Sequence, residues 1–415
     1  MAQQHLDPTD PGTGPKTGLT TGPPAAPTAG PVSAETLAGY LRAQATEFLR
    51  ALRLHREAGA GTASEGSVEA SLALRRSARR ISGSLHTFQA VLDPGWSEAM
   101  RPELAWVSGT LALEHACSAR LERLLQALYR LSGTAALPAQ GAAGTGPGGG
   151  AGGAGGAARS SAPAAVAVRG EAASPTARTG STGAGPTTAP ERGSLTVGAA
   201  KAGALLDRQL TLARTRAHST ALQALGSSRF HAVADKVAVL ASEVPLVPGA
   251  GGADLRPPAE AARERLVDAV AALPLLTAGS PYNAEALVHG LSPDLAPHPQ
   301  DAPWHQVRLL LRLHRYAREA LHHTTAGADG TAPVPESAAT APPPDVRLLA
   351  AGEALDRHRD ASEASAAAAN AARTPRIAPA TAYALGVLHA DQRHEVEAAR
   401  YAFQLSWQKD VLGSP

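Results

Sequence analysis

The chain has 415 residues and a formal net charge of +2, with 41 glycines and 33 prolines concentrated in a few stretches. A chain so close to neutral carries no global mark of a nucleic-acid or membrane-surface binder, so any anion site must come from local clustering of charge. The single cysteine, Cys117, excludes a disulfide within the chain, and neither a signal-peptide core nor a run of about 18 apolar residues is present, so we expect a cytoplasmic protein.

Three segments rich in Pro, Gly, Thr and Ala are predicted to be disordered: a tail at 1–32, a linker at 138–193 and a flexible loop at 324–344. Between them apolar residues recur at helical spacing, whereas aromatics make up only 3% of the chain and no stretch alternates with period two. The predicted helices span 34–57, 66–91, 98–132, 197–225, 228–243, 258–274, 302–322, 346–372 and 378–409. We therefore predict an all-α fold built from antiparallel bundles.

The stretch LALRRSARRISGSLHTF at 72–88 combines an apolar stripe with a basic face when it is projected on a helix. The apolar stripe consists of Leu74, Ala78, Ile81, Leu85 and Phe88. The polar arc consists of Arg75, Arg79, Ser82 and His86, and it is widened by Arg76 and Arg80. A solvated helix face normally mixes charge signs, because like charges one turn apart repel each other. A face of one sign therefore points to a bound anion.

The stretch HQVRLLLRLHRY at 305–316 repeats this design. On a helix its basic residues fall within one arc of roughly 80°; they are His305, Arg308, Arg312 and Arg315. The neighbouring arc is expected to face the core and contains Leu309, Leu310, Leu313 and Tyr316. His314 projects to the side opposite His305 and is left out of the basic set.

Two pairs of stretches match in the same order along the chain, which indicates an internal duplication. Positions 72, 75, 79 and 82 align with 305, 308, 312 and 315. Further along each half, LALEHA at 111–116 matches LGVLHA at 385–390, and this match places His115 opposite His389.

The basic stretches resemble the signature of CHAD domains, the conserved histidine α-helical domains. The form H-x-x-R-x-x-x-[RK]-x-x-R followed by Tyr is complete at 305–316. The first copy carries Arg75, Arg79 and Arg80 of the matching family segment H-x-x-R-V-x-x-R-R. The resemblance covers roughly 33–137 and 195–410. The chain departs from the family pattern where Leu72 replaces the histidine of the first copy, and where His115 and Ala116 replace an Arg-Asp pair.

The resemblance implies two antiparallel four-helix bundles related by a pseudo-twofold axis, one at 33–245 and one at 258–410. It also implies a central groove, lined by basic residues of both halves, that binds inorganic polyphosphate. The planar fork of an arginine suits phosphate oxygens, and histidines would add charge only when protonated. The predicted polyphosphate-binding residues are Arg75, Arg76, Arg79, Arg80, His86, His115, His305, Arg308, Arg312, Arg315 and His389. Arg214, His218, Arg229 and His231 are weaker candidates, for which a solvated helix face is the better explanation.

We expect no enzymatic activity, cofactor or metal site. Some CHAD proteins carry a CYTH triphosphatase domain with the strand motif E-x-E-x-K, but the nearest string here, Glu395 and Glu397 in EVEAAR, lies in a predicted helix. Two alternatives remain open. One is a helical scaffold that has lost polyanion binding and meets a protein partner, which the departures at Leu72, Ser82 and Ala116 keep in play. The other is nucleic-acid binding, which lacks the exposed aromatics that stack bases. As a polyphosphate binder, the protein would associate with polyphosphate granules.

Overall fold

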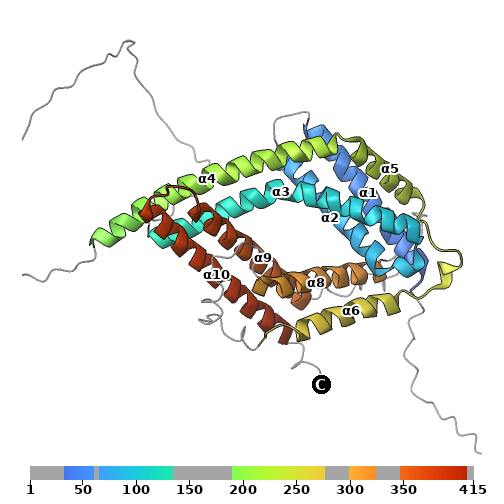
Figure 1. Cartoon of the computed structure of the whole chain (residues 1–415). Coiled ribbons are helices and arrows are strands. Elements are labelled where there is room, and N and C mark those ends of the chain that lie inside the picture. Colours follow the sequence, from blue (N-terminus) through green and yellow to red (C-terminus); the bar gives the residue numbers. More distant parts are fainter. Residues whose placement is uncertain (1–31, 60–64, 134–188, 276–298, 324–345, 409–415) are drawn as a thin grey trace, which may run out of the picture.

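The computed structural model describes residues 32–59, 65–133, 189–275, 299–323 and 346–408 (Figure 1). Within these ranges the secondary structure is helical, and the only β-pairing is an isolated antiparallel bridge between Leu92 and Leu246. The α-helices are α1 (Ala34–Gly59), α2 (Glu65–Thr87), α3 (Pro94–Ser132), α4 (Ala189–Leu225), α5 (Ser228–Ser242), α6 (Arg256–Ala271), α8 (Ala302–Leu321), α9 (Val346–Ala372) and α10 (Pro379–Gln408). Three short 3-10 helices are η1 (Gln89–Val91), η2 (Ala250–Gly252) and η3 (Pro299–Asp301). The predicted all-α fold is confirmed.

The predicted tail and loop lie almost entirely outside the described residues, as does most of the predicted linker at 138–193. The linker prediction was wrong at its end, because α4 already begins at Ala189. The prediction rested on the Pro- and Gly-rich composition of the whole tract. Pro190 nevertheless fits the first turn of α4, because the backbone N–H groups of that turn have no partner within the helix and a missing one costs little.

The sequence supplies clear signals for the ends of the long helix α3. The Asp93 carboxylate accepts a hydrogen bond from the backbone N–H of Trp96 at 2.7 Å, and Pro94 occupies the first helical position. Gly133 ends the helix in the left-handed conformation, at φ 67°, which glycine adopts without a steric penalty. Ser227 caps α5 in the same way as Asp93 caps α3, through the N–H of Phe230 at 3.2 Å.

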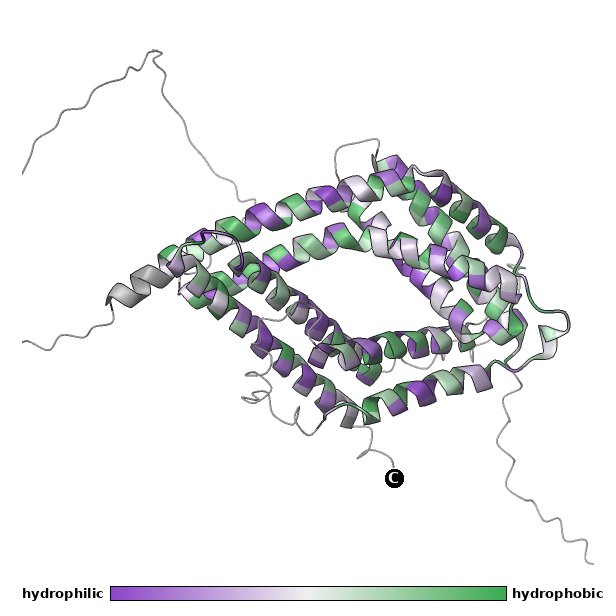
Figure 2. Ribbon diagram, viewed as in Figure 1, coloured by the Kyte–Doolittle hydropathy of each residue, from purple (hydrophilic) through white to green (hydrophobic). Residues whose placement is uncertain are grey.

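The helices are arranged in a ring (Figure 1). Helices α2, α3, α8 and α9 lie on the inner side of the ring, and α1, α4, α6 and α10 pack behind them. Each helix carries both hydrophilic and hydrophobic residues (Figure 2), as expected for amphipathic helices that bury one face. No helix in the described ranges combines the length and the apolar composition needed to cross a bilayer.

Three apolar cores hold this ring together. The first joins α1, α2, the start of α3 and α5 to the end of α8; it contains the whole predicted stripe of 72–88, whose five residues are fully buried. The second joins the end of α3 and α4 to the ends of α9 and α10 that meet at their connecting turn. The third joins α6, α8, α9 and the end of α10. Because the first two cores contain residues of both halves, the halves are interlocked, and the internal duplication stays a prediction.

The core face of α8 differs from the predicted one. Leu309, expected in the core, is 53% exposed, whereas Val307, Leu311 and His314 are buried. The reason is that α8 packs against α6 and α9 on the side of the arginine row away from Leu309. A helical projection of α8 alone does not show which side its neighbours cover. Tyr316 does face a neighbour, because a Cβ at Gly83 of α2 would lie 2.6 Å from its ring.

The close approach of α4 to α10 gives the first testable prediction. A Cβ at Gly198 would lie 2.2 Å from the backbone oxygen of Ala380, so Gly198→Ala must push the two helices apart. We expect the free energy of unfolding, measured by urea denaturation, to fall by about 1–3 kcal/mol. The control is Gly386→Ala in α10, where a Cβ meets no atom within 4 Å and alanine should stabilise the helix by about 0.5–1 kcal/mol. Equal effects of the two changes would contradict the observed helix contact.

Candidate anion-binding cavity

The inner helices enclose a cavity of about 540 Å³. Its lining contains ten arginines and four carboxylates, so positive charge is in clear excess. From α2 and α3 it is lined by Leu72, Arg75, Arg76, Arg79, Arg80, His115, Ala116, Ala119, Arg120 and Arg123. From α8 and α9 it is lined by Arg308, Arg312, Arg315, Tyr316, Glu319, Asp356, Arg359, Asp360 and Glu363. Helix faces that are far apart in the sequence thus form one basic surface.

Carboxylates of the cavity neutralise part of the α8 wall. Asp356 of α9 accepts hydrogen bonds from Arg308 and from Arg312, the latter at 2.8 Å. At the other end of α8, Glu319 accepts a hydrogen bond from Arg80 at 2.7 Å. Two of the three arginines in the HQVRLLLRLHRY stretch are therefore already paired within the chain.

The α3 wall is neutralised in the same way. Glu363 of α9 pairs with Arg120 of α3 and with Arg359 of its own helix, the latter at 2.7 Å. Arg123 donates a hydrogen bond to the side-chain oxygen of Gln392 at 2.6 Å. These arginines were not predicted. Arg120 and Arg123 follow His115 on the side of α3 that lines the cavity. Their position after His115 in the sequence could have marked them as candidates.

Four arginines of the cavity have no carboxylate partner within the described residues: Arg75, Arg76, Arg79 and Arg315. Burial, together with the nearby charge of Arg75, lowers the pKa of Arg79 to about 10. Burial also lowers the pKa of Arg75, with a contribution from Arg359. The Nε of Arg75 is buried and has no hydrogen-bond partner among the residues that the structure describes.

This arrangement is chemically suited to an anionic ligand. Partly buried like charges repel each other, and the loss of hydration adds a further cost in free energy unless an opposite charge is bound. A ligand with several anionic oxygens would supply both the charge and the missing hydrogen-bond acceptors. The described residues gather no group of three or more His, Cys, Asp or Glu that could hold a metal ion.

The structure brings together eight of the eleven predicted site residues and leaves three out. Those that line the cavity are Arg75, Arg76, Arg79, Arg80, His115, Arg308, Arg312 and Arg315. His86, His305 and His389 do not line it. The ring centre of His305 lies 5.5 Å from that of the buried His358, and burial lowers the pKa of His305, which disfavours its charged form. The Nδ1 atom of His389 lies 3.0 Å from the backbone oxygen of Ser365.

The weaker candidates Arg214, His218, Arg229 and His231 belong to α4 and α5 and do not line the cavity. His218 and Arg229 contact carboxylates of α3 at 2.9 and 2.7 Å. These contacts agree with the alternative that the sequence favoured, a solvated helix face.

Arg359 and the α9 carboxylates were missed in the sequence for a physical reason. The stretch DRHRDASE at 356–363 mixes charge signs, which is typical of a solvated helix surface, and only its position opposite α2 and α8 turns it into a cavity wall. By contrast, Leu72 and Ala116 both line the cavity, so the two departures from the family pattern fall at the site itself.

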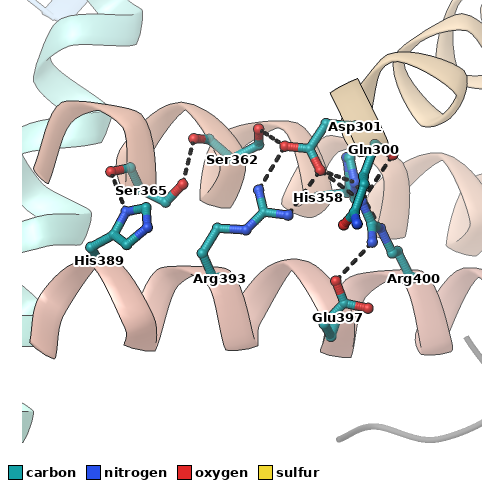
Figure 3. Close-up of polar contacts among 9 residues, drawn as sticks. All are labelled: Gln300, Asp301, His358, Ser362, Ser365, His389, Arg393, Glu397 and Arg400. Atoms are coloured by element: carbon teal, nitrogen blue, oxygen red, sulfur yellow. Dashed lines mark hydrogen bonds and ion pairs between the residues drawn. The ribbon is translucent and has the colours of Figure 1, made fainter. Parts of the chain in front are cut away.

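A buried polar network fixes the start of α8 against α9 and α10 (Figure 3). Asp301, fully buried, accepts hydrogen bonds from Arg393 at 2.7 and 3.1 Å and from Arg400 at 2.7 Å. Ser362 of α9 donates another. Burial by itself raises the pKa of Asp301, but the hydrogen bonds and charge of Arg393 outweigh it and hold the pKa well below its usual range.

The same network reaches the aromatic core beside it. Arg400 also donates to Glu397 at 2.7 Å, and its guanidinium lies 5.3 Å from the Trp304 ring centre. Since Asp301 directly precedes α8, the network sets how α8 lies on α9, and with it the contact of Asp356 with the α8 arginines.

Comparison with known proteins agrees with this geometry. The CHAD domain family matches residues 43–341. The structure of PptA from Streptomyces chartreusis is 62% identical, with a TM-score of 0.65, and the match covers 91% of this chain and 99% of that one. No curated protein matches significantly. The CHAD family model matches most of the chain, and the arginines of α2 and α8 that carry the family pattern line one cavity. This chain therefore belongs to the CHAD domain family.

Proposed function

We propose that the protein binds inorganic polyphosphate in the arginine-lined cavity and does not act on it chemically. The observation that carries the proposal is the set of four cavity arginines without a carboxylate partner in the described residues, two of which have lowered pKa values. A site that is positively charged, partly buried and short of acceptors favours a ligand with many anionic oxygens.

A linear polyanion suits the way the arginines are spaced. Arg75 and Arg79 are one helical turn apart, so their side chains repeat about every 5–6 Å along α2. Phosphate groups joined in a chain can meet such a row without any reading of sequence. Membership of the CHAD family supports the same ligand, because the family resemblance implies polyphosphate binding independently of the cavity.

The lining favours polyphosphate over single-stranded nucleic acid. Proteins that bind single strands without sequence preference stack the bases on aromatic side chains. Among the described residues that line the cavity Tyr316 is the one aromatic, and it packs against α2 at Gly83. The polar lining consists of arginines, one histidine and the carboxylates that pair with them, a set suited to holding an anion.

The experiment is a titration of the whole chain with long-chain polyphosphate at low and high salt. With about four phosphate contacts, the affinity should fall roughly 50-fold between about 50 and 200 mM salt, because binding releases condensed counterions. Isothermal titration calorimetry gives both the affinity and the slope. An absence of binding at low salt, or an affinity that does not change with salt concentration, would contradict the proposal.

A further inference from the structure

The carboxylates of α9 form a row along one wall of the cavity. Asp356, Asp360 and Glu363 are spaced by one helical turn, so they share a face of the helix. All three line the cavity, and two of them hold arginines of the other walls. The row therefore pairs with the same arginines that a bound polyanion would contact.

The row divides the arginines of the cavity into two sets. The open subsite consists of the arginines without a carboxylate partner in the described residues: Arg75, Arg76, Arg79 and Arg315. The closed subsite consists of those held by Asp356 and Glu363: Arg308, Arg312, Arg120 and Arg359.

We propose that the α9 carboxylates are a built-in competitor that keeps the closed subsite shut to short phosphates and opens it to a chain already anchored at the open subsite. This inference rests on the proposed function and deepens it, because it makes ligand length the property that the site selects. The ligand class is a linear polyphosphate long enough to reach both subsites.

The contacts support a displaceable competitor. The side chain of Asp356 is 49% exposed and that of Glu363 is 32% exposed, whereas those of Arg308 and Arg312 are only 15% and 24% exposed. The carboxylates can therefore turn out to solvent while the arginines stay in the wall.

The physical reason for length selection is effective concentration. At the closed subsite, a free short phosphate must compete with a carboxylate that belongs to the chain and is therefore always present beside the arginines. A short phosphate then fills only the open subsite. The second segment of an anchored chain is presented to the closed subsite at a local concentration on the order of millimolar or above, as for two linked binding modules. Only the long ligand then gains from both sets of arginines.

The test compares the wild-type chain with the double variant Asp356→Asn/Glu363→Gln, using tripolyphosphate and long-chain polyphosphate as probes in calorimetry. We expect the wild type to bind one tripolyphosphate per chain and the variant to bind two. The affinity for long-chain polyphosphate should rise roughly tenfold per carboxylate removed, as expected for a charge a few ångströms away at intermediate dielectric. The single variant Asp356→Asn, which leaves the Glu363 pairs intact, should show the same trend at half the size on a logarithmic scale.

Glu103→Gln is the matched control for the single variant Asp356→Asn, because Glu103 pairs with Arg229 outside the cavity and each change removes one negative charge. It should leave both the number of bound tripolyphosphates and the affinities unchanged. A stoichiometry that stays at one in both α9 variants, or a lower affinity for the long chain, would mean that the carboxylates orient the arginines, and the competitor would be rejected. A wild type that binds no long-chain polyphosphate would instead refute the proposed function, while a second tripolyphosphate on the variant would still support the competitor.

Discussion

Replacing Asp301 by asparagine is expected to lower the free energy of unfolding by about 3–5 kcal/mol. Asp301 is the shared acceptor of two buried arginines, Arg393 and Arg400, and asparagine would leave Arg393 without its counter-ion and Arg400 with Glu397 as its remaining carboxylate partner. Urea denaturation at neutral pH measures the change. Asp254→Asn is the control: its partner Arg256 is half exposed, and surface pairs contribute little.

The pH dependence of stability provides the second readout of the same change. The pKa of Asp301 is held well below its usual range in the folded chain, so its stabilising contribution is complete above about pH 5, where the unfolded chain is ionised too. As the pH falls further, the unfolded chain takes up the proton first and the contribution is lost. The free energy of unfolding of the wild type should therefore drop more steeply in acid than that of Asp301→Asn. Parallel pH profiles would contradict the role given to this carboxylate.

Removal of the open subsite is expected to have the largest effect on ligand binding. The double variant Arg75→Ala/Arg79→Ala loses two charge-assisted donors to phosphate, each worth about 1.5–3 kcal/mol, so the affinity for long-chain polyphosphate should fall at least about 100-fold. Arg308→Ala/Arg312→Ala should lose only about tenfold, because Asp356 already holds these arginines and must be displaced first. Calorimetry at low salt ranks the two variants.

The stability of these variants distinguishes lost binding from lost folding. Burial and the repulsion of neighbouring arginines lower the pKa values of Arg75 and Arg79, so their removal relieves an unfavourable interaction in the ligand-free chain. The free energy of unfolding without ligand is expected not to fall. Arg214→Ala, an exposed position of α4 outside the cavity, is the control for a lost positive charge. A greater loss of affinity in Arg308→Ala/Arg312→Ala than in Arg75→Ala/Arg79→Ala would overturn the division into open and closed subsites.

Local patterns predicted most of the elements. The stripe Leu74, Ala78, Ile81, Leu85 and Phe88 is fully buried as its spacing requires, and each predicted helix is present, with its ends shifted by at most eight residues, at the start of α4. The errors arose where a helix has more than one possible partner. Helix α8 touches the first and the third core, so its amphipathic pattern did not say which flank of the arginine row is covered, and Leu309 was placed on the wrong side.

The sequence by itself determined that two helices carry basic faces of one sign, since charge and helical period are local properties that survive any tertiary arrangement. The tertiary structure alone decided which of those charges are free. Asp356 lies on a separate helix far along the chain and neutralises Arg308 and Arg312 of the complete signature, while Arg75 and Arg79 of the degraded copy are left without a carboxylate among the described residues. Electrostatic pairing depends on distance in space, which packing sets, and so the stretch that best matches the family pattern is not the one with the most available charge.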